Sequence, residues 1–104
     1  MITVSVLYPN EANLRFDMDY YLNRHIPLVR RLLGSALKGV QVERGISGGT
    51  PGSSAPFFVL VHLTFDSLDA FQAAFGPHAA AIQQDIPNYS SVTPIVQVSE
   101  VTSS

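Results

Sequence analysis

The sequence contains no cysteine among its 104 residues. This absence excludes disulfides, thiolate chemistry and cysteine metal ligands together. Charged residues are also scarce, at 13% of the chain, and the six basic ones are not gathered into a stripe that could follow a phosphate backbone. We therefore expect no binding to nucleic acid, and a net charge of −2 favours no anionic membrane surface.

Long hydrophobic runs are absent as well. No apolar stretch approaches the roughly 18 residues that a membrane-spanning helix needs. The N-terminal run, residues 1–8, alternates between apolar and polar positions as a strand does, and it is too short for the apolar core of a signal peptide. We expect a soluble, cytoplasmic protein with no membrane partner.

Apolar residues are abundant, at 46% of the chain. The length is close to the commonest size of one domain and no break in composition divides it, so we expect a single domain over residues 1–104. High apolar content with few charges predicts one compact core and leaves apolar surface for a partner. A homodimer is the expected assembly.

Hydrophobic periodicity divides the chain into six elements. Alternation with a period of two predicts strands, and apolar residues three and four positions apart predict helices. The predicted order is strand 2–8, helix 17–33, strand 38–47, strand 57–65, a helix that starts at Ser67 and carries its apolar stripe to Ile82, and strand 92–101. A loop is predicted for residues 85–91.

Capping and breaking residues refine the two helices. Asp17 is a predicted N-cap and Gly34 a predicted C-cap of the first helix. Pro27 removes a backbone donor and clashes with the carbonyl four residues earlier, so we expect a kink or break near His25. Gly76-Pro77 interrupts the second helix in the same way.

The glycine-rich segment 47–56 predicts a flexible hairpin connection. It lacks the Gly-Lys-Ser/Thr ending and the following helix of a phosphate-binding loop. The order βαββαβ then gives an α+β fold, in which a four-stranded antiparallel sheet carries both helices on one face. Because strand 57–65 is apolar on both faces, we expect a second copy of the chain to cover the bare face and form a barrel-like dimer.

His25 is the first candidate for chemistry, because it lies on the apolar stripe of the first helix. Tyr21 is one turn earlier on the same side and Asp17 another turn earlier, so a phenol and a carboxylate can line up behind the imidazole. Burial would keep the imidazole neutral and able to accept a proton near pH 7. The structural alternative is a histidine that bonds a backbone carbonyl freed by Pro27.

The other histidines and the tyrosines are weaker candidates. His78 follows the break in the second helix and His62 lies on a strand, so either could contact a substrate or serve a structural role. Three histidines on three elements also raise the alternative of a zinc site, but their spacing does not support it. Tyr8 and Asp17 complete the candidates for substrate binding. Tyr20 joins Tyr21 as a candidate catalytic hydroxyl, and Tyr21 is the better placed of the two to point at the sheet.

Three segments together resemble the EthD family of the dimeric α/β-barrel superfamily: Val6-Leu7-Tyr8-Pro9, Phe16-Asp17-Met18-Asp19-Tyr20-Tyr21, and His25-Ile26-Pro27. The resemblance covers nearly the whole chain. It implies a ferredoxin-like protomer that pairs through its sheet faces, with a pocket between sheet and helices. It also implies a role in catabolism or secondary metabolism, with the family histidine carried over onto His25.

The leading hypothesis is a cofactor-independent enzyme that moves protons on a small apolar metabolite bearing a carbonyl or a phenol. Similar barrels work as isomerases, dehydratases or oxygenases. His25 would be the general acid or base, and Tyr21 or Tyr20 would hydrogen-bond the developing oxyanion. The alternatives are a non-catalytic binding protein for a hydrophobic metabolite, and a purely structural dimer module with a filled core.

Overall fold

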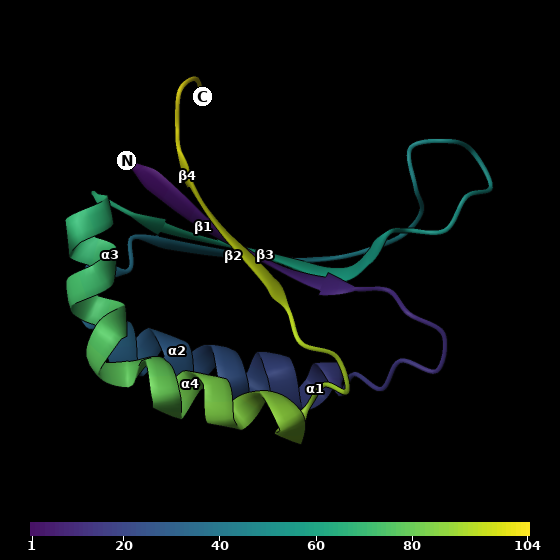
Figure 1. The fold of residues 1–104 in the computed structure, drawn as a ribbon, viewed down its shortest axis with the longest axis horizontal. Coiled ribbons are helices and arrows are strands. Elements are labelled where there is room, and N and C mark those ends of the chain that lie inside the picture. The colour runs from purple at the N-terminus through teal and green to yellow at the C-terminus, as the bar shows by residue number, and fades with distance from the viewer.

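The computed structural model describes residues 1–104 and places one antiparallel sheet above a layer of helices (Figure 1). The strand order is β2-β3-β1-β4, and every neighbouring pair is antiparallel. The strands are β1 Ile2–Pro9, β2 Gly39–Arg44, β3 Phe57–Phe65 and β4 Ile95–Glu100. This confirms the predicted α+β class with ferredoxin-like βαββαβ topology.

The alternation of each strand decides which side chains meet the helices. In the central strand β1, Val4 pairs with Leu63 of β3 and with Val98 of β4 across the sheet. Val4 is buried, whereas its neighbours Thr3 and Ser5 lie on the opposite face and are only half-buried. One face of the sheet is therefore the apolar face toward the helices, and the other is mixed in polarity.

The first helical segment runs from Met18 to Leu33 without a break. It consists of α1 Met18–Tyr20, a π-turn Tyr21–His25 and α2 Ile26–Leu33. The Asp17 carboxylate accepts a hydrogen bond from the Tyr20 amide at 3.0 Å, and Gly34 ends the segment with φ 60°, so both predicted caps are confirmed. The predicted break takes the form of the π-turn, whose wider turn accommodates Pro27 while the helix continues.

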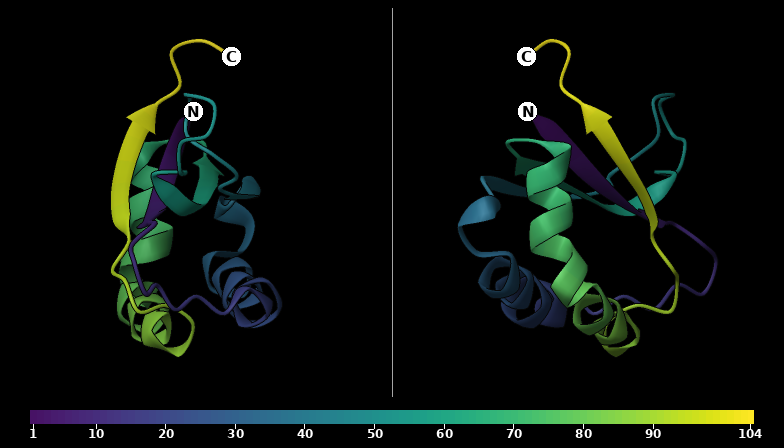
Figure 2. Two further views of the ribbon diagram at one scale, coloured as in Figure 1. Left: turned by 90° about the vertical axis from the view of Figure 1, so that its right-hand side faces the viewer. Right: turned by 60° about the vertical axis from the view of Figure 1, so that its left-hand side comes forward.

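The second helical segment changes direction where the sequence predicts its interruption. α3 Leu68–Phe75 is capped by Ser67, and a 3₁₀ turn at Gly76–His78 separates it from α4 Ala79–Asp85. α3 rises along one end of the sheet, whereas α4 runs beside α2 beneath the sheet (Figures 1 and 2). A second 3₁₀ turn, Ile86–Asn88, occupies part of the predicted loop 85–91.

Two predicted strands are shorter in the structure. β2 ends at Arg44, and Ile46, which falls within the predicted strand 38–47, is 96% exposed at the start of the long hairpin connection (Figure 1). β4 begins at Ile95, not at residue 92, because Pro94 has no backbone N–H to donate to the ladder. No helix of this chain combines the length and the apolar character needed to cross a membrane.

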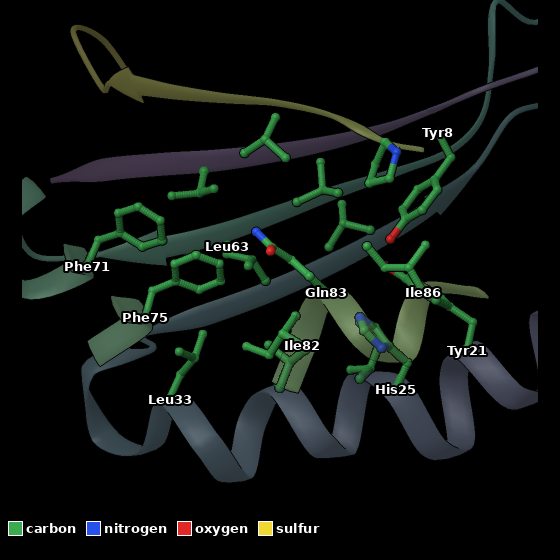
Figure 3. Close-up of a pocket in the computed structure, with 17 residues that line it drawn as sticks. Tyr8, Tyr21, His25, Leu33, Leu63, Phe71, Phe75, Ile82, Gln83 and Ile86 are labelled. Atoms are coloured by element: carbon green, nitrogen blue, oxygen red, sulfur yellow. The ribbon is translucent and has the colours of Figure 1, made fainter. Parts of the chain in front are cut away.

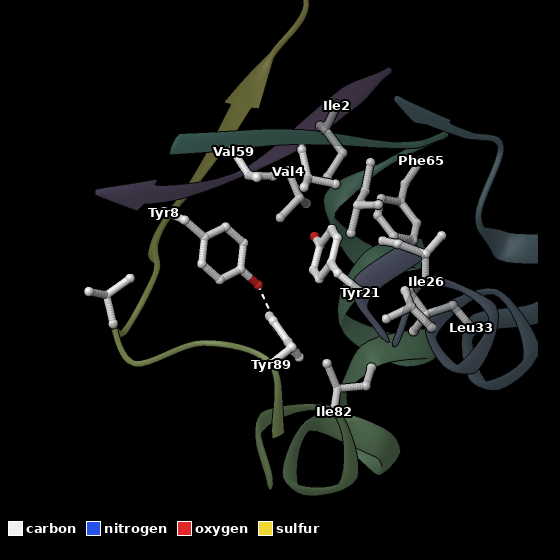
Figure 4. Close-up of a cluster of buried hydrophobic side chains, with 14 residues drawn as sticks. Ile2, Val4, Tyr8, Tyr21, Ile26, Leu33, Val59, Phe65, Ile82 and Tyr89 are labelled. Carbon is white, nitrogen blue, oxygen red and sulfur yellow. Dashed lines mark hydrogen bonds between the residues drawn. The ribbon is translucent and has the colours of Figure 1, made fainter. Parts of the chain in front are cut away.

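The core fills the space between the sheet and the helices (Figure 4). Its largest side chains with almost no exposed surface are three tyrosines and one phenylalanine. They are Tyr8 of β1, Phe65 of β3, Tyr21 of the π-turn and Tyr89 of the segment after α4. Three phenols in one core are unusual because each hydroxyl needs a hydrogen-bond partner there. The core is therefore apolar in its packing but polar at one end.

Candidate functional site

A cavity of about 220 Å³ lies between the inner face of the sheet and the helices (Figure 3). Apolar side chains from β1, β3, α2, α3 and α4 form most of its wall. Polar atoms reach it from only four side chains, which are Tyr8, Tyr21, His25 and Gln83, and no charged Asp, Glu, Lys or Arg side chain lines it. Such a wall suits a small, uncharged and largely apolar molecule.

His25 stands on the helix side of this cavity and is only 4% exposed. Its Nδ1 lies 2.8 Å from Oδ2 of Asp85, the last residue of α4. An ionised carboxylate can only accept hydrogen bonds, so Nδ1 carries the proton and Nε2 is left with a free electron pair when the ring is neutral. The partner of the imidazole thus comes from the other helical segment.

Asp85 is itself held by two further donors. The Tyr20 hydroxyl donates to its Oδ1 at 2.7 Å, and the side-chain amide of Asn88 donates to the same oxygen at 2.9 Å. Burial acts to raise the pKa of the Asp85 carboxyl, but the hydrogen bonds from Tyr20, Asn88 and His25 outweigh burial and leave the pKa below its ordinary value. The carboxylate is therefore ionised and fixed in orientation, and it holds the imidazole in one tautomer.

Two tyrosine hydroxyls extend this series of hydrogen bonds on the Nε2 side of the imidazole. The Tyr89 hydroxyl lies 3.3 Å from His25 Nε2, and it lies 2.6 Å from the hydroxyl of Tyr8 (Figure 4). The Tyr8 side chain lines the cavity, whereas Tyr89 is fully buried behind it. The Tyr21 ring stacks on the imidazole, with ring centres 5.3 Å apart and an angle of 18°.

Tyr89 is positioned by the chain around it. The backbone amide of Asp17 donates to the Tyr89 carbonyl at 2.7 Å, and Phe16 forms an isolated antiparallel bridge with Ser90. These contacts tie the segment after α4 to the start of α1. They bring Tyr89 next to His25, although 64 residues separate the two in sequence.

Burial shifts the pKa values of the site toward neutral forms. It lowers the pKa of His25 below its ordinary value of 6.5, although the hydrogen bond and the charge of Asp85 act in the opposite direction. Burial also raises the pKa values of Tyr8, Tyr21 and Tyr89 above 10.0. At neutral pH the site therefore contains a neutral imidazole and protonated phenols, with one carboxylate behind them.

The lowered pKa of His25 predicts a pH dependence of stability. Below about pH 6.5 the unfolded chain binds a proton at this residue before the folded chain does, so the free energy of unfolding should fall as pH falls, by at most about 1.4 kcal/mol per pH unit. The lowered pKa of Asp85 contributes only at more acidic pH. Urea denaturation between about pH 7.5 and pH 5.5 measures this slope.

The variant His25→Gln should have a flatter slope than the wild type, because it lacks the titrating group. Leu22→Ala, at an exposed position without a titrating group, is the control and should keep the wild-type slope. Equal slopes in the wild type and in His25→Gln would show that the folded and unfolded chains bind the His25 proton equally well.

The edge strand β4 contributes an exposed residue to the cavity wall. Val96 lines it but is 57% exposed, because β4 extends beyond the cover of the helices (Figure 2). Gln83 of α4 points from below toward this side of the sheet (Figure 3).

The structure brings together some of the residues proposed from the sequence. His25, Tyr21 and Tyr8 all line the cavity. Tyr20 lies outside the lining and reaches the site through its hydrogen bond to Asp85. Asp17 was expected behind the imidazole, but its carboxylate is used as the N-cap of α1.

The other two histidines lie away from the cavity. His62 is on the opposite face of the sheet, where its Nδ1 lies 3.2 Å from Ser5 Oγ and its Nε2 lies 3.3 Å from Oε1 of Glu43. His78 ends the 3₁₀ turn before α4 and does not line the cavity. Neither is placed to contact a molecule bound beside His25.

Asp85 and Tyr89 were missed as site residues, because they fell in the predicted loop 85–91. A signal for both was present in the sequence. The apolar stripe of the second helical segment continues from Ile82 to Asp85 and then to Tyr89 at three-and-four spacing. A carboxylate on a buried stripe needs a partner, just as a buried imidazole does.

The fold and the site together define a class: a ferredoxin-like α+β protein with an apolar cavity of small-molecule size and a buried histidine–carboxylate pair at its wall. The sequence profile of the EthD domain matches residues 12–93. This chain belongs to the EthD family.

Solved structures agree with this assignment. An EthD-like protein from Ralstonia eutropha JMP134 is 40% identical, with a TM-score of 0.92, and the match covers 98% of this chain and 92% of that one. An ethyl tert-butyl ether d (EthD) family protein from Bacillus halodurans C-125 is 22% identical, with a TM-score of 0.73 and coverage of 96% and 97%.

A more distant match is a dimeric ferredoxin-like protein of unknown function from Thermobifida fusca YX. It is 16% identical, with a TM-score of 0.56, and the match covers 96% of this chain and 89% of that one. At this identity the likeness shows a shared fold. Comparison with curated protein sequences finds no significant match.

Proposed function

We propose that this chain is a cofactor-independent enzyme that transfers protons on a small, largely apolar metabolite bearing a carbonyl or a phenol. One observation carries the proposal: the His25 imidazole lies at the wall of an apolar cavity, with Asp85 fixed on its Nδ1 at 2.8 Å. A neutral imidazole held in one tautomer is a competent proton acceptor near neutral pH.

The proposed chemistry begins with neutral His25. A proton leaves the substrate, from a hydroxyl or from a carbon next to a carbonyl, and the electron pair remains on the substrate as a phenolate or enolate. The resulting imidazolium is stabilised by the Asp85 carboxylate behind it. A cavity hydroxyl, from Tyr8 or Tyr21, hydrogen-bonds the oxyanion in a site with little water.

The fate of the substrate anion decides the type of reaction. Return of the proton to a different atom gives an isomerisation, and loss of a hydroxyl as water gives a dehydration. Reaction of the anion with dioxygen would give an oxygenation, with O₂ as the oxidant. The residues of the cavity fit the proton transfer that is common to all three.

The alternative proposal is a non-catalytic protein that binds a small hydrophobic metabolite in the same cavity. It is favoured by the almost wholly apolar wall, which buries a ligand without requiring chemistry. A purely structural module with a filled core does not account for a cavity of about 220 Å³. The two remaining functions differ in whether a proton leaves the ligand.

We also propose that the protein works as a homodimer that pairs through the outer face of the sheet. No helix covers this face (Figure 2). It carries the apolar side chains of Leu60 in β3 and Ile95 in β4, and Ile95 is 52% exposed. The relative from Thermobifida fusca, which has the same fold, is dimeric. In this arrangement the cavity lies on the far side of each sheet from the interface.

Deuterium exchange tests the proposed proton transfer without knowledge of the natural substrate. The wild-type protein is incubated in D₂O with a panel of ketones, lactones and phenols, and deuterium at exchangeable carbon is measured by mass spectrometry. We expect faster incorporation than in buffer for compounds that bind the cavity, with binding measured in parallel by calorimetry. Panel members that bind without accelerated exchange would favour the binding protein.

A further inference from the structure

The chain of hydrogen bonds through His25 has four members and ends at the cavity. Asp85 contacts Nδ1 of His25 at 2.8 Å, Tyr89 lies 3.3 Å from Nε2, and the hydroxyls of Tyr89 and Tyr8 are 2.6 Å apart. Tyr8 is the member of the chain beyond Tyr89 that lines the cavity. The Tyr21 hydroxyl also donates to the Tyr8 oxygen, so the remaining hydrogen-bonding position of Tyr8 is the one available to a ligand.

Each phenol has a single proton, so the directions of these hydrogen bonds are coupled. When His25 is neutral, Nδ1–H donates to Asp85 and Nε2 must accept. Tyr89 then donates to Nε2, and Tyr8 must donate to Tyr89. The Tyr8 oxygen is left with only a lone pair to offer to the cavity, and it can bind a ligand only as an acceptor.

Protonation of His25 reverses the direction of the hydrogen bonds that run from Nε2 through Tyr89 to Tyr8. Both ring nitrogens are then donors, so Nε2–H donates to the Tyr89 oxygen. Tyr89 donates in turn to Tyr8, and the Tyr8 proton points into the cavity. The same hydroxyl that accepted from a ligand now donates to one, so the hydrogen-bonding character of Tyr8 follows the charge of His25.

We infer that Tyr89 couples Tyr8 to His25, and that the cavity binds a neutral ring whose own hydroxyl, a phenol or an enol, donates to Tyr8. When this ligand ionises, its proton passes to the Tyr8 oxygen, the Tyr8 proton to Tyr89, and the Tyr89 proton to Nε2. The products are a ligand oxyanion and an imidazolium, and Tyr8 now donates to the oxyanion. No redox change accompanies the transfer. This inference rests on the proposed function in taking the cavity as the substrate site.

The residues around this series of hydrogen bonds suit a neutral ligand that bears a hydroxyl. The titratable groups around His25 are Asp85 from α4, Tyr89 from the segment after it and Tyr21 from its own helix, with Tyr8 of β1 reached through Tyr89. None of them carries a positive charge that would attract an anionic ligand. The strand β3 presents only apolar side chains to the cavity.

The pKa directions leave His25 as the group in this series of hydrogen bonds that changes charge between the titration of the carboxyl and that of the phenols, with a pKa below its ordinary value of 6.5. Burial raises the pKa values of the three phenols, and the pKa of Asp85 lies below its ordinary value. A change in the direction of the chain between about pH 8 and pH 5 is thus assigned to His25.

A matched pair of probes tests the inference by binding alone. 2-Naphthol can donate a hydrogen bond, whereas 2-methoxynaphthalene, its methyl ether, can only accept one. At about pH 8 we expect the naphthol to bind about tenfold more tightly than the ether, since a hydrogen bond to a buried acceptor is worth about 1.4 kcal/mol. Toward about pH 5 the preference should fall to within about twofold, because Tyr8 then donates to either oxygen.

The variant Tyr89→Phe separates this coupling from other effects of pH. It removes the hydroxyl that joins Tyr8 to His25, so the preference for naphthol should no longer change with pH. His78→Gln, which lies outside both the cavity wall and the outer face of the sheet, is the matched control and should behave as the wild type. A preference that is independent of pH in the wild type, or a dependence that survives in Tyr89→Phe, would overturn the inference.

Wild-type measurements suffice if Tyr89→Phe does not fold. ¹⁵N chemical shifts of the His25 ring must then show a proton on Nδ1 and none on Nε2 at about pH 8. The opposite tautomer, or failure of both naphthalenes to bind, would contradict the inference. Absence of deuterium exchange together with a pH-dependent preference would contradict only the proposed catalysis, and exchange without such a preference would contradict only the coupling.

Discussion

Replacing His25 with alanine is expected to lower the rate of deuterium exchange by about 10²-fold to 10⁴-fold, the contribution typical of a positioned general base. The fold should survive, because Asp85 keeps its hydrogen bonds from Tyr20 and Asn88 after the imidazole is removed. Circular dichroism and the apparent molecular mass establish that the variant is folded. The exchange rate of a cavity-binding ketone or phenol is then compared with that of the wild type.

Two further variants make this result specific. His78→Ala removes the same kind of side chain from a position that does not line the cavity and should exchange as the wild type does. Asp85→Asn keeps the imidazole but removes the carboxylate that stabilises its charged form, so an intermediate loss is expected. Unchanged exchange in a folded His25→Ala variant would assign the proton transfer to another group.

Replacing Tyr89 with alanine should have the largest effect on stability among the site residues, with a loss of about 3–5 kcal/mol in the free energy of unfolding. Its ring is 0% exposed and lies within 4.9 Å of the Tyr21 ring centre and within 4.6 Å of the His25 ring centre. Removing it leaves a void and deprives Tyr8 of its hydrogen-bond partner. Urea denaturation at pH 7.5 measures the loss.

Tyr89→Phe keeps the ring and should cost only about 1–3 kcal/mol, the penalty for leaving buried polar groups without a partner. Leu22→Ala provides a surface control, because Leu22 is 45% exposed, and it should change stability by less than about 0.5 kcal/mol. Equal losses for Tyr89→Ala and Tyr89→Phe would show that the hydroxyl, and not the ring packing, accounts for the contribution of this residue.

Local signals in the sequence were sufficient for most of the fold. The limits of β3, Phe57–Phe65, match the prediction because this strand is apolar throughout and ends in turn residues. Asp17, Gly34 and Ser67 acted as caps where the sequence placed them. The ends of β2 and β4 were less accurate, because the alternation continues past Arg44, where β2 ends, and because Pro94 keeps the preceding residues out of β4.

The site was only half predictable for a different reason. His25 and Tyr21 were found because their positions on a buried helical stripe can be read from spacing alone. The partners Asp85 and Tyr89 come from residues 60 and 64 positions later, and only the packing of α4 beside α2 brings them to the imidazole. Asp17 satisfied the same local pattern but was already engaged by the backbone of the helix that it begins.

The π-turn has a consequence for the phase of the first helical segment. Four of its five buried residues, Tyr21, His25, Val29 and Leu33, are spaced by four, and twelve residues of regular α-helix would turn about 120° beyond three full circles. One additional residue in a widened turn absorbs about 100° of that excess. A protein shortened by one residue between 21 and 25 could thus keep either its imidazole or its Leu33 facing the sheet, but not both. The extra residue lets one helix present an imidazole to the cavity from within the turn and pack apolar side chains after it.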